Sequence, residues 1–373
     1  MRRFTTASLA LTIAATGVLA GGALAVAQDG ADLKIGLVTD VGTIDDRNFN
    51  QYSWEGAVLG AEAVGAPAPQ YAISQQSADI GPNIQAFVDQ AYDIIVTVGF
   101  AAGADTIIAA KANPDIRFIG VDQAPCITEE GDPDDTFSCA GDPATLLPNL
   151  QGLNWREQQP GYLAGIIAAD VSETGHIAAV GGTAVIPAVV NYIEGYANGA
   201  KSVNPDAVVT VTYVSVAPDN AAFNDPAGGQ AIAQQLLAQD PEIDVLFQVA
   251  GKTGNGVLQA ACDAGIWAVG VDVDQYLSTP ETAGCTVTSA EKKLSNSVQS
   301  AIERIAAGED QGGSLFLDIS TGDVGISPFH EHEDAVSAEA IAAVEAATAG
   351  MIDGSLVTCE EQAGTGFCVQ TLP

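Results

Sequence analysis

A dense group of polar side chains lies near the start of the chain, just after its first predicted strand. It holds three aspartates, two asparagines and one aromatic residue: Asp40, Asp45, Asp46, Asn48, Asn50 and Phe49. Aspartate is a preferred helix N-cap, so Asp45 or Asp46 is expected to cap the helix that follows. Capping does not explain why Phe49 and Asn50 stand close to Asp40, and we therefore favour a ligand-binding role for this segment.

Two further aspartates, Asp122 and Asp272, each end a predicted buried strand, in the patterns Ile-Gly-Val-Asp and Val-Gly-Val-Asp. A carboxylate can accept hydrogen bonds from both hydroxyls of a vicinal diol, a geometry that suits a sugar. Taken singly, either residue is better interpreted as an ordinary loop aspartate. Because they recur at equivalent places in two similar halves of the chain, both interpretations stay open.

A glycine-rich segment, 251–256, follows a predicted strand and opens a predicted helix. A Walker A phosphate loop would need a glycine where Leu246 stands, so that motif is absent. We expect Gly251 to let the backbone approach a ligand, with the helix N-terminus supplying hydrogen-bond donors.

Motifs of hydrolytic enzymes are incomplete in this chain. Two short matches to serine β-lactamases occur, Ser289-Ala-Glu-Lys292 and Lys252-Thr-Gly254. Their order is reversed, and both Ser-Asp-Asn and Gly-x-Ser-x-Gly are missing. The histidines number three, and among them His330 and His332 are better interpreted as part of a solvated loop than as metal ligands. We expect no catalysis, no cofactor and no metal.

These side chains must be positioned by elements that alternate along the chain. Predicted strands cover residues 34–39, 93–98, 117–121, 176–180, 208–214, 244–249 and 267–271. Predicted helices cover residues 49–64, 102–112, 162–170, 190–203, 228–239 and 256–264. This rhythm is typical of parallel sheets covered by helices on both faces. Because it runs through twice, we predict two similar α/β lobes, with ligands bound beyond the carboxyl ends of the strands.

The composition excludes several classes of partner. The 373 residues are 47% hydrophobic, and 47 acidic residues face 12 basic ones, for a net charge of −35. Nucleic-acid binding needs cations to neutralise phosphates, and an anionic membrane surface would repel this chain. The charge is typical of a soluble acidic protein or one adapted to salt.

The N-terminus has the pattern of a cleaved signal peptide over residues 1–27. Two arginines at positions 2 and 3 precede an uncharged apolar run, and Ala25-Val-Ala27 forms the cleavage site. Cysteine is missing at this boundary, so we expect an exported, periplasmic or extracellular protein without a lipid anchor.

The cysteines number six and lie in three close pairs, 126 with 139, 262 with 285 and 359 with 368. Fifteen pairings are conceivable for six cysteines, but export to an oxidising compartment favours disulfides. We predict bridges Cys126–Cys139, Cys262–Cys285 and Cys359–Cys368.

Together these motifs resemble the basic membrane protein family of ABC-transporter solute-binding proteins, which includes purine nucleoside receptors. Residues 39–50 match the family signature T-D-x-G-x-x-D-D-x-S/N-F-N nearly throughout. Further matches follow in order: Trp155-Arg-Glu-Gln158, Tyr162-Leu-Ala-Gly165, Val180-Gly-Gly182, Glu194-Gly-Tyr196 with Gly199, Phe223-Asn-Asp-Pro226, Phe247-Gln-Val-Ala-Gly251, Gly254-Asn-Gly256, Val269-Gly-Val-Asp-Val-Asp-Gln275 and Thr288-Ser289 with Lys292. The resemblance covers roughly residues 34 to 335.

The resemblance implies a fold, a ligand and a partner. The fold is the periplasmic binding protein type I architecture, α/β, with two doubly wound Rossmann-like lobes joined by a three-strand hinge. The first lobe would comprise residues 28–152 plus 276–312, and the second residues 153–275 plus 313–373. A monomer would bind a nucleoside between the lobes and deliver it to an ABC permease in the membrane.

The resemblance also assigns roles to single residues. Phe49 and Tyr192 would sandwich the base, and Asp40 and Asn50 would contact its edge. The ribose would be held by Asp122, Gly251, Asp272 and Lys292. Two departures from the family, Tyr192 for phenylalanine and Lys252 for glycine, leave the nucleoside open. The alternatives are a receptor for another sugar-bearing or aromatic metabolite, and a nucleoside hydrolase.

Overall fold

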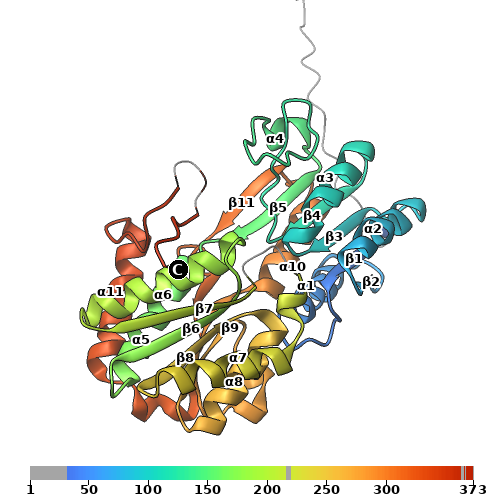
Figure 1. The fold of residues 1–373 in the computed structure, drawn as a ribbon. Coiled ribbons are helices and arrows are strands. Elements are labelled where there is room, and N and C mark those ends of the chain that lie inside the picture. Colours follow the sequence, from blue (N-terminus) through green and yellow to red (C-terminus); the bar gives the residue numbers. More distant parts are fainter. Residues whose placement is uncertain (1–31, 216–219, 363–364, 366, 373) are drawn as a thin grey trace, which may run out of the picture.

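The computed structural model describes residues 32–215, 220–362, 365 and 367–372, which fold into two α/β lobes (Figure 1). Each lobe is built on a six-stranded sheet. The predicted signal peptide, residues 1–27, lies outside the described residues.

The first sheet has the strand order β11-β5-β4-β3-β1-β2, and all its neighbouring strands are parallel. Its strands are β1 (Ile35–Val41), β2 (Gln70–Ser74), β3 (Ile94–Val98), β4 (Arg117–Val121), β5 (Leu150–Trp155) and β11 (Gly313–Leu317). Its helices are α1 (Phe49–Val64), α2 (Ile80–Asp89), α3 (Gly103–Ala112), α4 (Pro143–Leu146) and α10 (Leu294–Ala307). Side chains alternate along the strands, so Leu37 packs with α1 and α10 while Val38 packs with α2 and α3 on the other face.

The second sheet has the order β12-β10-β9-β8-β6-β7, with only β12 antiparallel among these described strands. Its strands are β6 (His176–Thr183), β7 (Val208–Ser215), β8 (Ile243–Val249), β9 (Trp267–Asp272), β10 (Thr286–Lys292) and β12 (Val324–Ile326). Its helices are α5 (Gln158–Val171), α6 (Pro187–Val203), α7 (Pro226–Gln239), α8 (Gly251–Ala264), α9 (Gln275–Ser278) and α11 (Ala338–Asp353). One face packs on α5, α6 and α11, and the opposite face packs on α7 and α8. Short 3₁₀ turns lie at Ser77–Asp79, Phe100–Ala102, Asn220–Phe223, Pro280–Thr282 and His330–Ala335.

The chain passes between the sheets three times, after β5, after β10 and after β11. Two lobes joined by three crossings were predicted, but the predicted boundaries were wrong for two strands. β10, placed by the prediction in the first lobe, pairs with β9 in the second sheet, and β11, placed in the second lobe, pairs with β5 in the first sheet. The physical reason is that each sheet is completed at its open edge by strands from the late part of the chain.

Helices α5 and α6 approach each other at backbone distance because both carry glycine at four-residue spacing. A Cβ on Gly161 or Gly165 would lie 2.3 or 2.0 Å from a backbone oxygen of α6. A Cβ on Gly195 or Gly199 would lie 2.2 or 1.9 Å from a backbone oxygen of α5. Only glycine allows this contact, which sets the position of every other residue on the two helices.

All three predicted disulfides are present, Cys126–Cys139, Cys262–Cys285 and Cys359–Cys368. Helix boundaries also follow local rules, since Asp225 accepts the N–H of Gly228 ahead of Pro226 at the start of α7. Within the described residues, no helix combines the length and the apolar character needed to cross a bilayer.

Candidate ligand-binding site

A cavity lies where the carboxyl ends of the two sheets face each other. It encloses about 760 Å³, including the part that is open to solvent. Its lining comes from β1 and the loop after it, from the loops after β3, β4, β6 and β7, from the ends of β8, β9 and β10, and from α1, α6 and α8. All eight predicted ligand residues line this cavity: Asp40, Phe49, Asn50, Asp122, Tyr192, Gly251, Asp272 and Lys292.

Lys292, the last residue of β10, joins the two lobes through an ion-pair cluster. Its Nζ lies 2.6 Å from Oδ2 of Asp122, which follows β4 of the first sheet. The same Nζ lies 3.5 Å from Oδ1 of Asp272, which ends β9 of the second sheet. Burial by itself lowers the pKa of Lys292, but the neighbouring carboxylates outweigh it and raise this pKa above its usual value. The lysine is therefore a permanent buried cation.

Both aspartates of this cluster are held in an unusual backbone conformation. Asp122 has φ +55° and Asp272 has φ +67°, in the left-handed region that residues other than glycine seldom adopt. Backbone strain of this kind is concentrated at functional sites, where surrounding contacts hold it in place. In addition, Oδ1 of Asp122 is buried and has no hydrogen-bond partner among the described residues. An acceptor is thus left free beside the cavity.

Tyr192 lies at the floor of the cavity. Only 1% of the residue is exposed, its hydroxyl donates to Oδ1 of Asp272 at 3.3 Å, and its ring meets Phe247 edge-on at 6.3 Å. Burial and nearby carboxylates raise the pKa of Tyr192 well above its usual value, so the hydroxyl stays a donor. Tyr192 therefore orients the carboxylate of Asp272. Little of the face of its ring is open to a flat ligand.

The loop after β1 is organised by Asp46. Its carboxylate accepts backbone N–H bonds from Asn48, Asn50 and Gln51 at 2.9 to 3.0 Å. Asp46 thus satisfies free N–H groups at the start of α1, as expected of Asp45 or Asp46, although the N-cap position itself is Asn48. The Asn50 amide donates to Asp46 at 3.0 Å and accepts the N–H of Asp40 at 2.9 Å. Asn50 therefore orients the backbone around Asp40.

Asp40 is one of three carboxylates of the first lobe that line the cavity, with Asp46 and Asp122. Burial raises the pKa of Asp40 to about 7, partly offset by the N–H of Val41. Repulsion from Asp122 and Asp46 contributes to the same rise in the pKa of Asp40, because like charges disfavour ionisation.

Aromatic rings surround the ammonium and the cavity. Lys292 Nζ lies 5.0 Å from the ring centroid of Phe49 and 5.3 Å from that of Trp155, within cation–π range. Phe100 and Phe223 also line the cavity and are half-buried, although we did not predict them as ligand residues. Phe100 closely follows β3, and Phe223 closely precedes α7. Both therefore lie at the carboxyl edge of a sheet, and this position in the sequence could have predicted them as ligand residues.

Gly251 opens α8 with φ +54°, and a Cβ there would lie 3.5 Å from the carbonyl oxygen of Phe223. Gly251 and Lys252 both line the cavity, so the first turn of α8 borders it as predicted.

The two histidines near the end of the chain, His330 and His332, do not line the cavity and each have a protein partner. His330 Nε2 lies 2.8 Å from Asp274, and His332 Nε2 lies 2.8 Å from the carbonyl oxygen of Ala283.

Two doubly wound lobes, three crossings and a cavity lined from both carboxyl edges define a periplasmic binding protein of type I. This fold occurs in the solute-binding proteins of ABC importers. Such solute-binding proteins act outside the cytoplasm. The model of the family described as ABC transporter substrate-binding protein PnrA-like matches residues 34–353. The chain therefore belongs to this family, and the resemblance seen in the sequence is confirmed.

Two relatives and one solved structure illustrate the similarity. The chain is 29% identical to the CD4+ T-cell-stimulating antigen of Listeria innocua, over 95% of this chain and 99% of the relative. It is 27% identical to the ABC transporter nucleoside-binding protein BmpA of Lactococcus lactis, over 87% of this chain and 88% of the relative. An ABC transporter solute-binding protein from Aeropyrum pernix has the same fold, with TM-score 0.73, 23% identity and coverage of 88% and 94%.

Proposed function

We propose that the protein binds a nucleoside, most suitably a purine nucleoside, in the cavity between its lobes and delivers it to an ABC permease without chemical change. The observation that carries this proposal is the cluster of Asp122, Lys292 and Asp272. It offers carboxylate acceptors from both lobes and one cationic donor, which suits the vicinal diol of a ribose. The unpartnered Oδ1 of Asp122 is the acceptor that a ligand hydroxyl would fill.

A flat base suits the aromatic lining of the same cavity. Phe49 borders it from the first lobe and Phe223 from the second. Both rings are half-buried and can gain contact area when a base lies between them. We therefore propose Phe49 and Phe223 as the rings that hold the base, in place of the pairing of Phe49 with Tyr192, whose ring is almost fully enclosed by protein.

The charge of the site favours a nucleoside over a nucleotide. Asp40, Asp122 and Asp272 line the cavity, and Lys292 supplies a single buried cation among them. A phosphate group would add negative charge to a region with an excess of carboxylates, at low dielectric constant. We expect the lobes to close over an uncharged ligand by a hinge motion at the three crossings.

Calorimetry of the mature protein with adenosine, guanosine, inosine, cytidine, adenosine monophosphate, adenine and ribose tests this proposal. We expect saturable binding of purine nucleosides, weaker binding of the free base and the free sugar, and at least about tenfold weaker binding of the monophosphate. Chromatography of the same mixtures checks for chemistry. Release of free base by sub-stoichiometric protein would identify a nucleoside hydrolase, and binding of ribose as tight as that of adenosine would identify a sugar receptor.

A further inference from the structure

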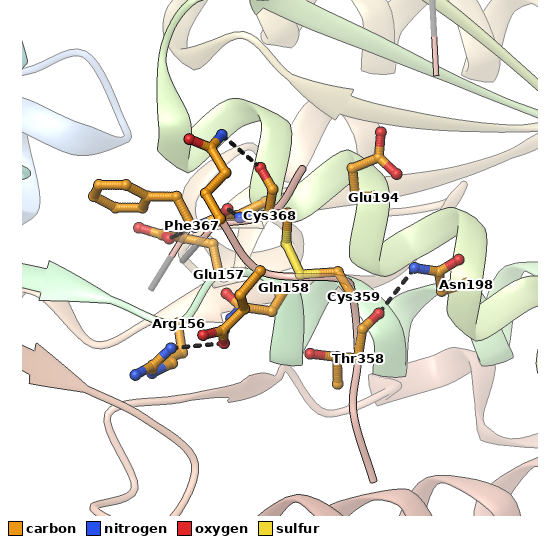
Figure 2. The surroundings of a disulfide bond; sticks show 12 residues. Arg156, Glu157, Gln158, Glu194, Asn198, Thr358, Cys359, Phe367 and Cys368 are labelled. Carbon is orange, nitrogen blue, oxygen red and sulfur yellow. Dashed lines mark hydrogen bonds and ion pairs between the residues drawn. A yellow bond between two sulfur atoms is a disulfide. The ribbon is translucent and has the colours of Figure 1, made fainter. Parts of the chain in front are cut away.

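The end of the chain forms a strap over the second lobe. The C-terminal strap, residues 354–362 and 367–372 as described, follows α11 and crosses α5 and α6, with the Cys359–Cys368 disulfide closing a loop within it (Figure 2). The amide of Asn198 donates to the carbonyl oxygen of Thr358 at 2.9 Å. Farther along, the backbone N–H groups of residues 371 and 372 donate to Glu194 at 2.6 and 2.9 Å. The strap is thus anchored to α6 on both sides of its disulfide.

The strap also holds the first crossing between the lobes. Glu361 pairs with Arg156 at 2.8 Å and accepts the amide of Gln158 at 3.3 Å. Residues 156 and 157 connect β5 of the first sheet to α5 of the second lobe, which begins at Gln158. The ion pair is partly exposed and stabilises the fold little by itself, but it fixes where the strap lies.

One buried amide connects the strap to the interior. Asn191 of α6 is fully buried, and its Oδ1 accepts the N–H of Cys368 at 2.8 Å. Its Nδ2 donates to Oε2 of Glu157 at 3.0 Å. The orientation of the amide is determined by these partners, because a backbone N–H must meet the oxygen and a carboxylate must meet the nitrogen.

Glu157 stands at the end of this connection and acts on the ligand site. The residue is 2% exposed, and burial raises the pKa of Glu157 to about 7, with Lys292 opposing this and Asp122 adding to it. In turn Glu157 is the third carboxylate, after Asp122 and Asp272, that favours the charged form of Lys292. Among the described residues no ion pair joins Glu157 to Lys292 directly, so Lys292 and Asp122 act on Glu157 through charge at longer range. Trp155, two residues before Glu157, places its ring 5.3 Å from Lys292 Nζ.

We propose that Glu157 is a positioning residue of the ligand site and that the disulfide-closed strap holds it in place through Asn191. The strap fixes the N–H of Cys368, this N–H fixes the Asn191 amide, and the amide fixes the carboxylate that balances Lys292. Reduction of Cys359–Cys368 releases the first of these bonds and leaves the lysine less well placed for a ligand. The expected effect on nucleoside binding rests on the proposed function, whereas the link from the strap through Asn191 to Glu157 does not.

A titration of ligand-free protein tests the connection directly. Carbon-13 NMR of labelled glutamate carboxyls follows Glu157, whose signal is assigned by its loss in Glu157→Gln. Asn191→Ala and the pair Cys359→Ser with Cys368→Ser should each raise the Glu157 pKa by about half a unit to one unit, because the ionised carboxylate loses its N–H donor. The matched control is Cys262→Ser with Cys285→Ser, since Cys285 precedes β10 and Lys292 ends it, roughly 20 Å away.

Two results would overturn the proposal. One is that the pair Cys359→Ser with Cys368→Ser leaves the pKa of Glu157 unchanged, or shifts it no more than the control pair Cys262→Ser with Cys285→Ser does. The other is an unchanged titration in Asn191→Ala, which keeps all three disulfides and remains informative if the serine variant does not fold.

A double-mutant cycle then measures the effect on binding. With inosine or guanosine at pH 7, the strap variant should bind about three- to tenfold more weakly than the native protein. In a Glu157→Gln background the same two serines should change affinity by less than about twofold. Equal weakening in both backgrounds would mean general loosening and contradict the proposal. If the native protein binds no nucleoside, the proposed function fails, and the titration still decides whether the strap holds Glu157.

Discussion

At the scale of single residues, the site is organised around one buried ammonium. Lys292 is 3% exposed and lies within reach of Asp122, Asp272 and the rings of Phe49 and Trp155. Desolvating a cation is costly, and it is stable here only because opposite charges surround it. Removing one of the two carboxylates therefore affects both the binding of a ligand and the charge balance around Lys292.

The first prediction concerns Asp272 and the sugar. Asp272→Ala should weaken adenosine binding by about ten- to a hundredfold, since a charge-assisted hydrogen bond contributes roughly 1.5–3 kcal/mol. Adenine lacks the ribose and should be affected far less. Calorimetry with both ligands measures the difference, and Asp263→Ala, at an exposed position on α8, is the matched control. Equal weakening of adenine and adenosine would show that Asp272 does not contact the sugar.

The second prediction concerns the rings that hold the base. Phe49→Ala and Phe223→Ala should each weaken all nucleosides to a similar degree, because every base has a π-face and stacking contributes about 1–3 kcal/mol per base. Tyr192→Phe keeps the ring and removes only the hydroxyl that donates to Asp272. It should therefore affect nucleosides and spare free bases. If Phe223→Ala binds nucleosides normally, Phe223 is not one of the two rings.

At the scale of elements, the contact between α5 and α6 positions much of the site. Tyr192 and Asn191 lie on α6, and Glu157 immediately precedes α5. The backbone of each helix meets glycines of the other, so the relative height of these side chains depends on residues without side chains. A shift between the two helices would separate Asn191 from Glu157.

The third prediction tests this packing. Gly199→Ala places a Cβ 1.9 Å from the carbonyl oxygen of Tyr162, so the helices must move apart. The free energy of unfolding should fall by about 1–3 kcal/mol, as for other overpacked interiors, despite the better helix propensity of alanine. Urea denaturation of the ligand-free protein measures the change. Gly103→Ala on α3 is the matched control, since a Cβ there meets nothing within 4 Å. Similar stability of the two variants would contradict the close packing of α5 and α6.

At the scale of the whole molecule, the net charge of −35 and the two carboxyls with raised pKa values, Asp40 and Glu157, destabilise the fold in the same direction as the pH rises. Burial raises the pKa of both Asp40 and Glu157 to about 7, from ordinary values of 3.8 and 4.5. The stability that these protonated carboxyls contribute is present below their ordinary pKa values and is lost as the pH rises to about 7. His176 changes in the same direction, because its hydrogen bond to Asp240 raises the pKa of His176.

Stability at low pH is limited by carboxylates whose pKa values are lowered in the folded protein. The side chains of Thr136 and Ser138 lower the pKa of Asp134 to about 2, and the hydrogen bond from His176 lowers that of Asp240. The stability that these groups contribute is present above their ordinary pKa and is lost as the pH falls through the lowered one.

The fourth prediction follows from these two limits. Unfolding temperature should be highest near about pH 5 and should fall between pH 5 and 8. Asp40→Asn should flatten that fall, because it removes one of the raised carboxyls. The control is Asp353→Asn, whose lowered pKa affects only the acidic limb. Differential scanning calorimetry across this range measures both, and an unfolding temperature that rises up to pH 8 would contradict the prediction.

Prediction from the sequence succeeded where the local pattern was strong. The runs at 117–121 and 267–271 are continuous and apolar, and they form β4 (Arg117–Val121) and β9 (Trp267–Asp272) almost as expected. It missed five strands, β2, β5, β10, β11 and β12. In β10, Thr-Val-Thr-Ser-Ala-Glu-Lys, five of the seven residues are polar although all seven are buried. Burial is tolerated because the Thr288 hydroxyl donates to the carbonyl oxygen of Ser327 beside β12, and the Ser289 hydroxyl accepts the N–H of Gln275. Such partners come from distant parts of the chain, so no local pattern contains them.

The sequence by itself determined the two α/β lobes, the family, the three disulfides and the residues that gather at the cavity, because each is encoded in local periodicity, close cysteine spacing or an ordered motif. Only the tertiary structure decided how these residues are used. It enclosed the ring of Tyr192, left Phe223 at the cavity, and connected Cys368 to Glu157 through Asn191. Residues separated by 177 and 34 positions meet there. The physical reason is that burial and hydrogen-bond partners depend on which surfaces the helices present to one another, and the close packing of α5 and α6 fixes that after the chain has folded.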